Sequence, residues 1–139
     1  MLLADDHEEV LAALSAAFAS EDYDVVVAKN GREAIEHFRE GHFDIALLDL
    51  NMPAKGGWEA FERLTTIHPL LQVVVITARP DQYPLAAAAG VAALMEKPLD
   101  LPRLLLTIEH LLCEPMERRL SRLAGKHPIT RYLRAEEKL

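Results

Sequence analysis

Two short apolar runs of this chain end in aspartate side chains. Residues 1–4 lead directly into Asp5 and Asp6, and residues 43–48 lead into Asp49. Apolar runs of this length, bounded by turn residues, are typical of strands buried on both faces of a parallel sheet. Open α/β sheets bind their ligands at the carboxyl ends of such strands. We therefore expect the three carboxylates to converge at one edge of a sheet.

Carboxylates gathered at one edge repel one another unless a proton or a cation compensates their charge. A pair about 4 Å apart repels by about 4 kcal/mol at an effective dielectric constant of roughly 20. Mg2+ suits such a place because it is a hard cation that takes oxygen ligands and keeps several of its waters. The three aspartates therefore predict a Mg2+ site.

Two further strand-like runs end in residues that can bind oxyanions. Residues 72–76 precede Thr77, and residues 91–96 precede Lys97. A hydroxyl and an ammonium group beside a metal ion could stabilise phosphoryl transfer to a carboxylate, with Asp49 as nucleophile and an acyl phosphate as product. In the structural alternative, Lys97 pairs with a carboxylate and Thr77 caps a helix. The position of all five residues at successive strand ends favours the chemical interpretation.

The apolar runs alternate with helical patterns, which predicts a doubly wound parallel sheet with helices on both faces. Strands are expected over residues 1–4, 24–28, 43–49, 72–77 and 91–96. Helices are expected over residues 8–20, 30–40, 58–68, 85–89 and 100–113. Asn30 is a suitable N-cap for the second helix. Pro80 and Pro84 predict an irregular loop before a short fourth helix.

The length of 139 residues, half of them hydrophobic, suits one domain with a substantial core. We assign this domain to residues 1–113 and interpret residues 114–139 as a charged helical extension or linker, with helices over 115–123 and 128–139. The single cysteine, Cys113, suits a reducing compartment. No apolar run is long enough to span a bilayer, so a cytoplasmic location without membrane contact is expected.

Charge is unevenly distributed along the chain. Residues 114–139 hold seven Lys and Arg residues against four Glu, a net charge of +3, so residues 1–113 carry −10 of the total of −7. An acidic body argues against direct nucleic-acid binding by residues 1–113. The basic tail fits a solvated helix face or a contact with an acidic partner.

Four short segments of the chain resemble the receiver domain of two-component response regulators, the CheY-like family. They are Ala-Asp-Asp-His at residues 4–7, Leu-Leu-Asp-Leu-Asn-Met-Pro at 47–53, Ile-Thr-Ala at 76–78 and Glu-Lys-Pro at 96–98, in the order and near the spacing of that family. The resemblance covers about residues 1–113. It implies a flavodoxin-like fold of five parallel strands in the order 2-1-3-4-5, with five helices.

The resemblance also implies roles for the aspartates. Asp49 would accept a phosphoryl group from the phosphohistidine of a sensor histidine kinase or a phosphotransfer protein, as in a phosphorelay. Asp6 and Asp49 would bind Mg2+ directly, and Asp5 would bind it through water. The backbone carbonyl of Asn51 would complete the protein ligands.

The remaining motif residues of the family include one departure in this chain. Thr77 and Lys97 would bind the phosphoryl oxygens, and the bond before Pro98 would be cis. The family often has an aromatic residue three positions before the lysine, whose rotation follows phosphorylation, and this chain has Leu94 there. The proline-bearing segment 79–84 is a second departure, because the fourth helix and fifth strand form much of the family's output face.

The leading hypothesis is a phospho-accepting signalling switch, without turnover beyond self-catalysed phosphotransfer and dephosphorylation. The options for its output are a downstream protein partner, an output domain outside this chain, and a second copy in a homodimer. One alternative is a phosphate-independent interaction module. Another is a Mg2+-dependent phosphohydrolase with an aspartyl nucleophile, although such enzymes carry that nucleophile at their first strand. The six histidines show no metal-ligand spacing and are expected on the surface or in loops.

Overall fold

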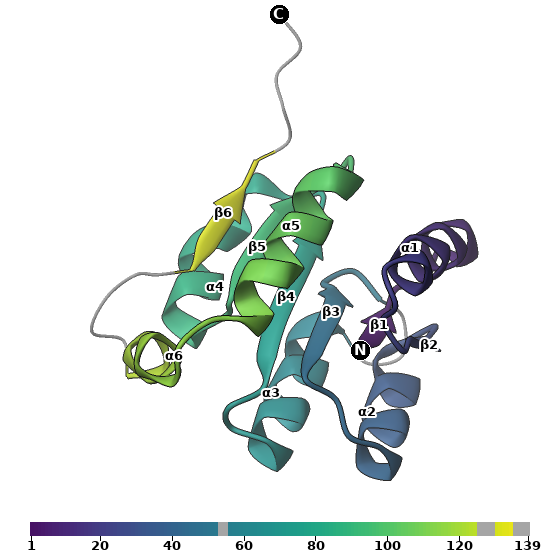
Figure 1. Ribbon diagram of the computed structural model, residues 1–139. Coiled ribbons are helices and arrows are strands. Elements are labelled where there is room, and N and C mark those ends of the chain that lie inside the picture. Colours follow the sequence, from purple (N-terminus) through teal and green to yellow (C-terminus); the bar gives the residue numbers. More distant parts are fainter. Residues whose placement is uncertain (53–55, 125–129, 135–139) are drawn as a thin grey trace, which may run out of the picture. The chain divides into compact units, whose positions relative to one another are not determined.

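The computed structural model describes residues 1–52, 56–124 and 130–134 (Figure 1). The strands are β1 (Leu2–Ala4), β2 (Val26–Ala28), β3 (Ile45–Asp49), β4 (Gln72–Thr77), β5 (Ala93–Glu96) and β6 (Arg131–Leu133). The helices are α1 (Glu8–Ser20), α2 (Gly31–Glu40), α3 (Gly57–Ile67), α4 (Tyr83–Ala89), α5 (Leu101–Leu112) and α6 (Met116–Leu123), with a 3-10 turn, η1, over Pro80–Gln82. The strand order is β2-β1-β3-β4-β5-β6, which confirms the predicted order of the first five strands.

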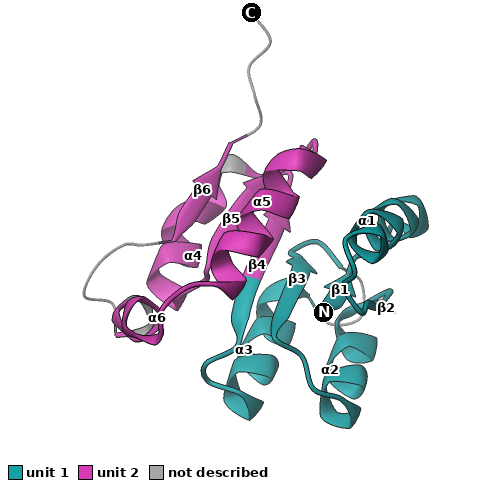
Figure 2. Cartoon of the chain, in the orientation of Figure 1, with its two compact units in different colours: residues 1–73 teal, residues 74–139 magenta. Residues whose placement is uncertain are grey.

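The chain divides into two compact units, residues 1–73 and residues 74–139 (Figure 2). In the first unit, β1 pairs in parallel with both β2 and β3. In the second unit, β5 pairs in parallel with both β4 and β6. Parallel pairing requires helical crossovers between strands, which is why helices alternate with strands along the sequence.

The core of the first unit is built from fully buried strands and one apolar stripe on each helix. Every residue of β1 and β3 is buried. The helices contribute Leu11, Leu14 and Phe18 from α1, Ala34, Ile35 and Phe38 from α2, and Ala60, Phe61 and Leu64 from α3. The predicted N-cap is confirmed, since Asn30 Oδ1 accepts a hydrogen bond of 2.9 Å from the backbone N–H of Glu33.

The second unit holds most of β4, a fully buried strand, and a short fourth helix. The predicted irregular segment is confirmed, because the 3-10 turn η1 precedes α4, which spans only Tyr83–Ala89. Gly90 ends α4 in the left-handed region, at φ 80°, where glycine avoids the strain of a Cβ. Asp100 caps α5 by accepting a hydrogen bond of 3.2 Å from the N–H of Arg103.

The C-terminal extension differs from its prediction. The first expected helix is present as α6, but the second, over residues 128–139, is wrong where the structure describes it, because residues 131–133 form β6. Residues 125–129 and 135–139 lie outside the described residues. The sequence Thr-Arg-Tyr-Leu at 130–133 combines a β-branched and an aromatic residue, and both types favour a strand beside an available sheet edge.

The start of α3 packs tightly against the end of β3. Most of the loop expected between Pro53 and Gly57 lies outside the described residues, but Gly57 itself donates its N–H to Leu50 O over 3.3 Å. A Cβ atom on Gly57 would lie 2.5 Å from the backbone oxygen of Asp49 and 2.5 Å from Leu50 Cα. Those backbone atoms belong to the turn after the strand, so Gly57 is required for this close approach.

We expect Gly57→Ala to lower the free energy of unfolding by about 1–3 kcal/mol, because the added methyl group meets backbone that has no flexible end to move. Gly56→Ala is the matched control, since a Cβ there meets no atom within 4 Å. That variant should change stability by less than about 1 kcal/mol. Denaturant unfolding of both variants checks this, and equal effects would contradict the packing argument.

Candidate functional site

Asp5 and Asp49 lie side by side because of the register of their strands. The β1–β3 pairing places Ala4 opposite Leu48, so the residues that follow, Asp5 and Asp49, leave the sheet together. Both aspartates are buried, each with 1% of its surface exposed. The expected convergence of strand-end carboxylates is therefore present within the first unit.

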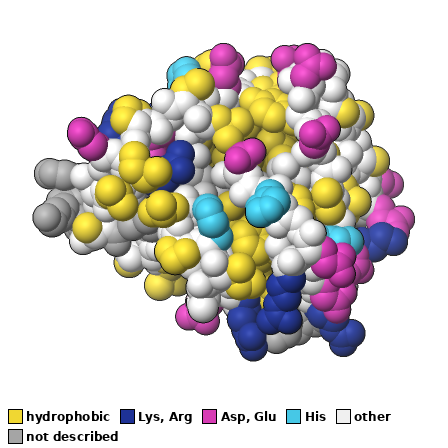
Figure 3. Space-filling view, turned by 60° about the horizontal axis from the view of Figure 1, so that its bottom comes forward, with side chains coloured by type: hydrophobic (Ala, Val, Ile, Leu, Met, Phe, Trp, Pro, Cys, Tyr) yellow, Lys and Arg dark blue, Asp and Glu magenta, His cyan; other side chains and the backbone are white. Residues whose placement is uncertain are grey.

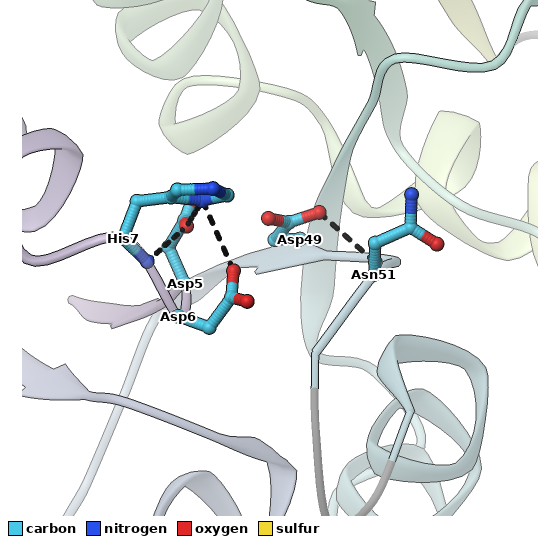
Figure 4. A network of polar contacts seen from close by, with 5 residues as sticks. All are labelled: Asp5, Asp6, His7, Asp49 and Asn51. Atoms are coloured by element: carbon cyan, nitrogen blue, oxygen red, sulfur yellow. Dashed lines mark hydrogen bonds and ion pairs between the residues drawn. The ribbon is translucent and has the colours of Figure 1, made fainter.

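Asp6 and His7 complete a compact cluster around these two carboxylates (Figure 4). One ligand-type atom from each of Asp5, Asp6, His7 and Asp49 lies within 4.8 Å of the others. Oxygen atoms from three carboxylates within this span match the hard donor set that Mg2+ takes. The chemistry of the cluster therefore fits the cation predicted from the sequence.

His7 is the member of this cluster that the sequence analysis missed. Its Nδ1 lies 2.9 Å from Asp5 Oδ1 and 3.0 Å from Asp6 Oδ1, while the side chain remains 60% exposed. The expectation of a surface position was correct, but the imidazole also contacts two candidate metal ligands. A search for histidine pairs with metal-ligand spacing does not find this arrangement. The sequence feature that indicates it is the position of His7 directly after the two aspartates.

The same local hydrogen bond forms at the end of three strands. Asp5 Oδ1 accepts from the N–H of His7 over 2.9 Å, and Asp49 Oδ1 accepts from the N–H of Asn51 over 3.0 Å. In the second unit, Thr77 Oγ1 accepts from the N–H of Arg79 over 3.0 Å. Such bonds to the residue two positions on turn the chain away and fix the side chain that accepts.

In the second unit, Thr77 and Lys97 meet at the ends of β4 and β5. Thr77 is fully buried, and its carbonyl oxygen accepts a hydrogen bond of 2.8 Å from the N–H of Lys97. Lys97 is half-buried, and the bond between Lys97 and Pro98 is cis, the isomer that the resemblance implies. Leu94, at the position where the family often has an aromatic residue, is fully buried.

Surface charge is mixed on the face drawn in Figure 3. Acidic and basic side chains lie among apolar ones in the described part of that face, and Lys and Arg gather along its lower margin beside acidic groups. Among the described helices, none combines the length and the hydropathy that a membrane crossing requires.

Comparisons with known proteins place this geometry in one family. A family model described as the response regulator receiver domain matches residues 1–109. A response regulator receiver protein of Anaeromyxobacter sp. (strain Fw109-5) is 35% identical over 106 residues, which cover 75% of this chain and 44% of that protein. The regulatory protein AtoC of Escherichia coli (strain K12) is 31% identical over 114 residues, covering 81% of this chain and 25% of that protein. The chain thus spans less than half the length of these curated relatives.

Solved structures show the same fold. The CheY-like receiver domain protein from Methanospirillum hungatei JF-1 superposes with a TM-score of 0.78 at 24% identity, covering 84% of this chain and 95% of that one. A CheX–CheY complex with BeF3 and magnesium from Borrelia burgdorferi gives a TM-score of 0.76 at 23% identity, covering 81% of this chain and 88% of that one. Together with the family model, these likenesses show that the chain belongs to the response-regulator receiver family.

Proposed function

We propose that Asp49 is the phosphoacceptor of this receiver domain and that its donor is the phosphohistidine of a sensor histidine kinase or a phosphotransfer protein. The observation that carries this proposal is the cluster of Asp49 with Asp5, Asp6 and His7, whose ligand-type atoms lie within 4.8 Å of one another. In the transfer, an Asp49 carboxylate oxygen bonds to phosphorus and the nitrogen–phosphorus bond of the donor breaks. The donor imidazole keeps the electron pair and takes up a proton, and Asp49 becomes an acyl phosphate.

We assign the metal ligands of the proposed site as follows. Asp6 and Asp49 would hold Mg2+ directly, Asp5 would hold it through water, and the backbone carbonyl of Asn51 would add a further oxygen. When bound, Mg2+ supplies positive charge to the phosphoryl oxygens during transfer. The hydrogen bond of 3.0 Å from Asn51 N–H holds one carboxylate oxygen of Asp49 in a fixed orientation.

Thr77 and Lys97 are the residues that we propose to bind the transferred group. The hydroxyl of Thr77 can donate to a phosphoryl oxygen, and the ammonium of Lys97 adds charge that the chain itself provides. The hydrogen bond between Lys97 N–H and Thr77 O supports a shared role, because it ties the two strand ends together.

The output of the switch belongs to this proposal as well. We infer a cytoplasmic regulator in which phosphorylation alters the contact with a downstream protein partner, a second copy or an output domain, without direct binding of nucleic acid by residues 1–113. The chain spans only part of its relatives, several of which carry the name transcriptional regulatory protein ZraR. Chemistry is confined to self-catalysed phosphotransfer and dephosphorylation.

Phosphorylation by a small phosphodonor tests the assignment of Asp49. Incubated with acetyl phosphate and Mg2+, the parent should gain the mass of one phosphoryl group, because the proposed acceptor set supports transfer without a kinase. Intact mass spectrometry should find no adduct on Asp49→Asn or without Mg2+. Absence of the adduct from a folded parent that also fails to bind beryllofluoride would overturn the proposal. Turnover of generic phosphate esters would instead favour the hydrolase alternative.

The position of His7 generates a prediction about metal affinity. Because His7 Nδ1 contacts the carboxylates of Asp5 and Asp6, the imidazole competes with a cation for their oxygens. In His7→Ala the cation no longer has to displace a hydrogen bond to these carboxylates. The net free energy of about one hydrogen bond predicts that this variant binds Mg2+ roughly 2–10-fold more tightly than the parent. Calorimetric titration measures this, with the exposed His42→Ala as the control. Weaker binding by His7→Ala would mean that the imidazole is itself a ligand.

A further inference from the structure

Residues 130–134, which we call the docked strand, extend the sheet of the second unit beyond β5. The register pairs Ala93 with Arg131 and Leu94 with Tyr132. The N–H of Arg131 donates to Ala92 O over 3.1 Å, and Thr130 Oγ1 donates to Val91 O over 2.6 Å. The docked strand therefore occupies the edge of β5 by backbone pairing, with a buried hydroxyl at its start.

Both the ring and the hydroxyl group of Tyr132 make contacts with residues outside the docked strand. Its ring centroid lies 4.6 Å from that of Tyr83 on α4, at an interplanar angle of 35°. Its hydroxyl donates to Glu96 Oε2 over 2.6 Å, and this bond raises the pKa of the Tyr132 phenol because it stabilises the protonated form. A Phe or Leu at this position would leave the Glu96 acceptor without that donor.

Side chains of α4 and α5 bind the backbone at both ends of the docked strand. Tyr83 Oη donates to Thr130 O over 3.3 Å, and Arg103 Nη1 donates to Arg134 O over 2.9 Å. Sheet edges bind extended peptides by backbone hydrogen bonds together with contacts to particular side chains, and the docked strand has both.

The docked strand is nevertheless less buried than the strand beside it. Each of the three residues of β6 is only partly buried, whereas Ala93, Leu94 and Met95 of the neighbouring strand β5 are at most 1% exposed. Within the docked strand, Thr130 is the buried residue, at 6% exposure. Segments with few buried apolar groups open locally at lower free energy than the core that they cover.

We propose that the edge of β5, with Tyr83, Glu96 and Arg103, is a binding surface for an extended peptide strand, and that residues 130–134 occupy it as an internal, displaceable ligand. The partner that fits is a segment of another protein with a hydroxyl residue first and a tyrosine third, because the side chains of Thr130 and Tyr132 make the contacts described above. The tethered strand competes with this partner, since a free partner binds only the fraction of molecules whose edge is open.

Peptide binding tests the proposal directly. The probe is a fluorescent peptide with the sequence of residues 128–136, added to the full chain and followed by anisotropy. Tyr132→Ala, which weakens docking of the internal strand, should bind the peptide at least 10-fold more tightly than the parent. A Tyr83→Ala change in that background should abolish the gain, and a scrambled peptide should not bind. Equal binding to parent and Tyr132→Ala, or no binding to either, would overturn the proposal.

Hydrogen exchange of the parent chain provides a second test. It needs no substitution, so a variant that fails to fold cannot affect its result. The amide of Arg131, bonded to Ala92 O, should exchange at least 10-fold faster than that of Lys97, bonded to Thr77 O. Its rate should also be insensitive to low denaturant, as local opening requires. If both amides exchange at one rate with the same denaturant dependence, the strand is not displaceable and the proposal fails.

Discussion

The burial of Asp5 and Asp49 in neighbouring positions is the constraint on which the first unit depends. Two carboxylates with 1% exposure lie together because β1 and β3 pair in register. Their repulsion, on the order of 4 kcal/mol for a pair about 4 Å apart, has to be offset. Backbone N–H groups of His7 and Asn51 offset part of it, and the His7 imidazole contributes a further contact. Gathering carboxylates in this way lowers the stability of the folded state, and a bound cation would raise it again.

Local chain geometry maintains this arrangement. Each carboxylate accepts from the N–H two residues further on, so the turn that ends the strand also orients the side chain. Gly57 then lets α3 approach the backbone of Asp49 more closely than any residue with a Cβ would. The position of Asp49 therefore follows from β3, from its own turn and from the helix that succeeds it.

Much of the fold and of the site could be predicted from the sequence. Buried runs that end in Asp5 and Asp49 located the strand ends, and Asn30 located a helix start, because each signal is local. His7 was missed because the histidines were searched for the spacing of metal-ligand pairs, whereas the contacts of His7 are with the aspartates directly before it, Asp5 and Asp6. The strand at residues 131–133 was missed because charged neighbours give it a helical pattern, whereas its contacts with Tyr83 and Glu96 are long-range.

The dependence of thermal unfolding on Mg2+ tests the central claim most directly, in the parent and in Asp49→Asn. Saturating Mg2+ should raise the Tm of the parent by several degrees, since a ligand of the folded state at about 100 times its Kd adds about 2.7 kcal/mol. Asp49→Asn removes one charge but retains an oxygen for the Asn51 N–H, so it should melt higher than the parent without Mg2+ and lose most of the Mg2+ response. A parent whose Tm ignores Mg2+, together with an Asp49→Asn variant that melts lower, would contradict the account.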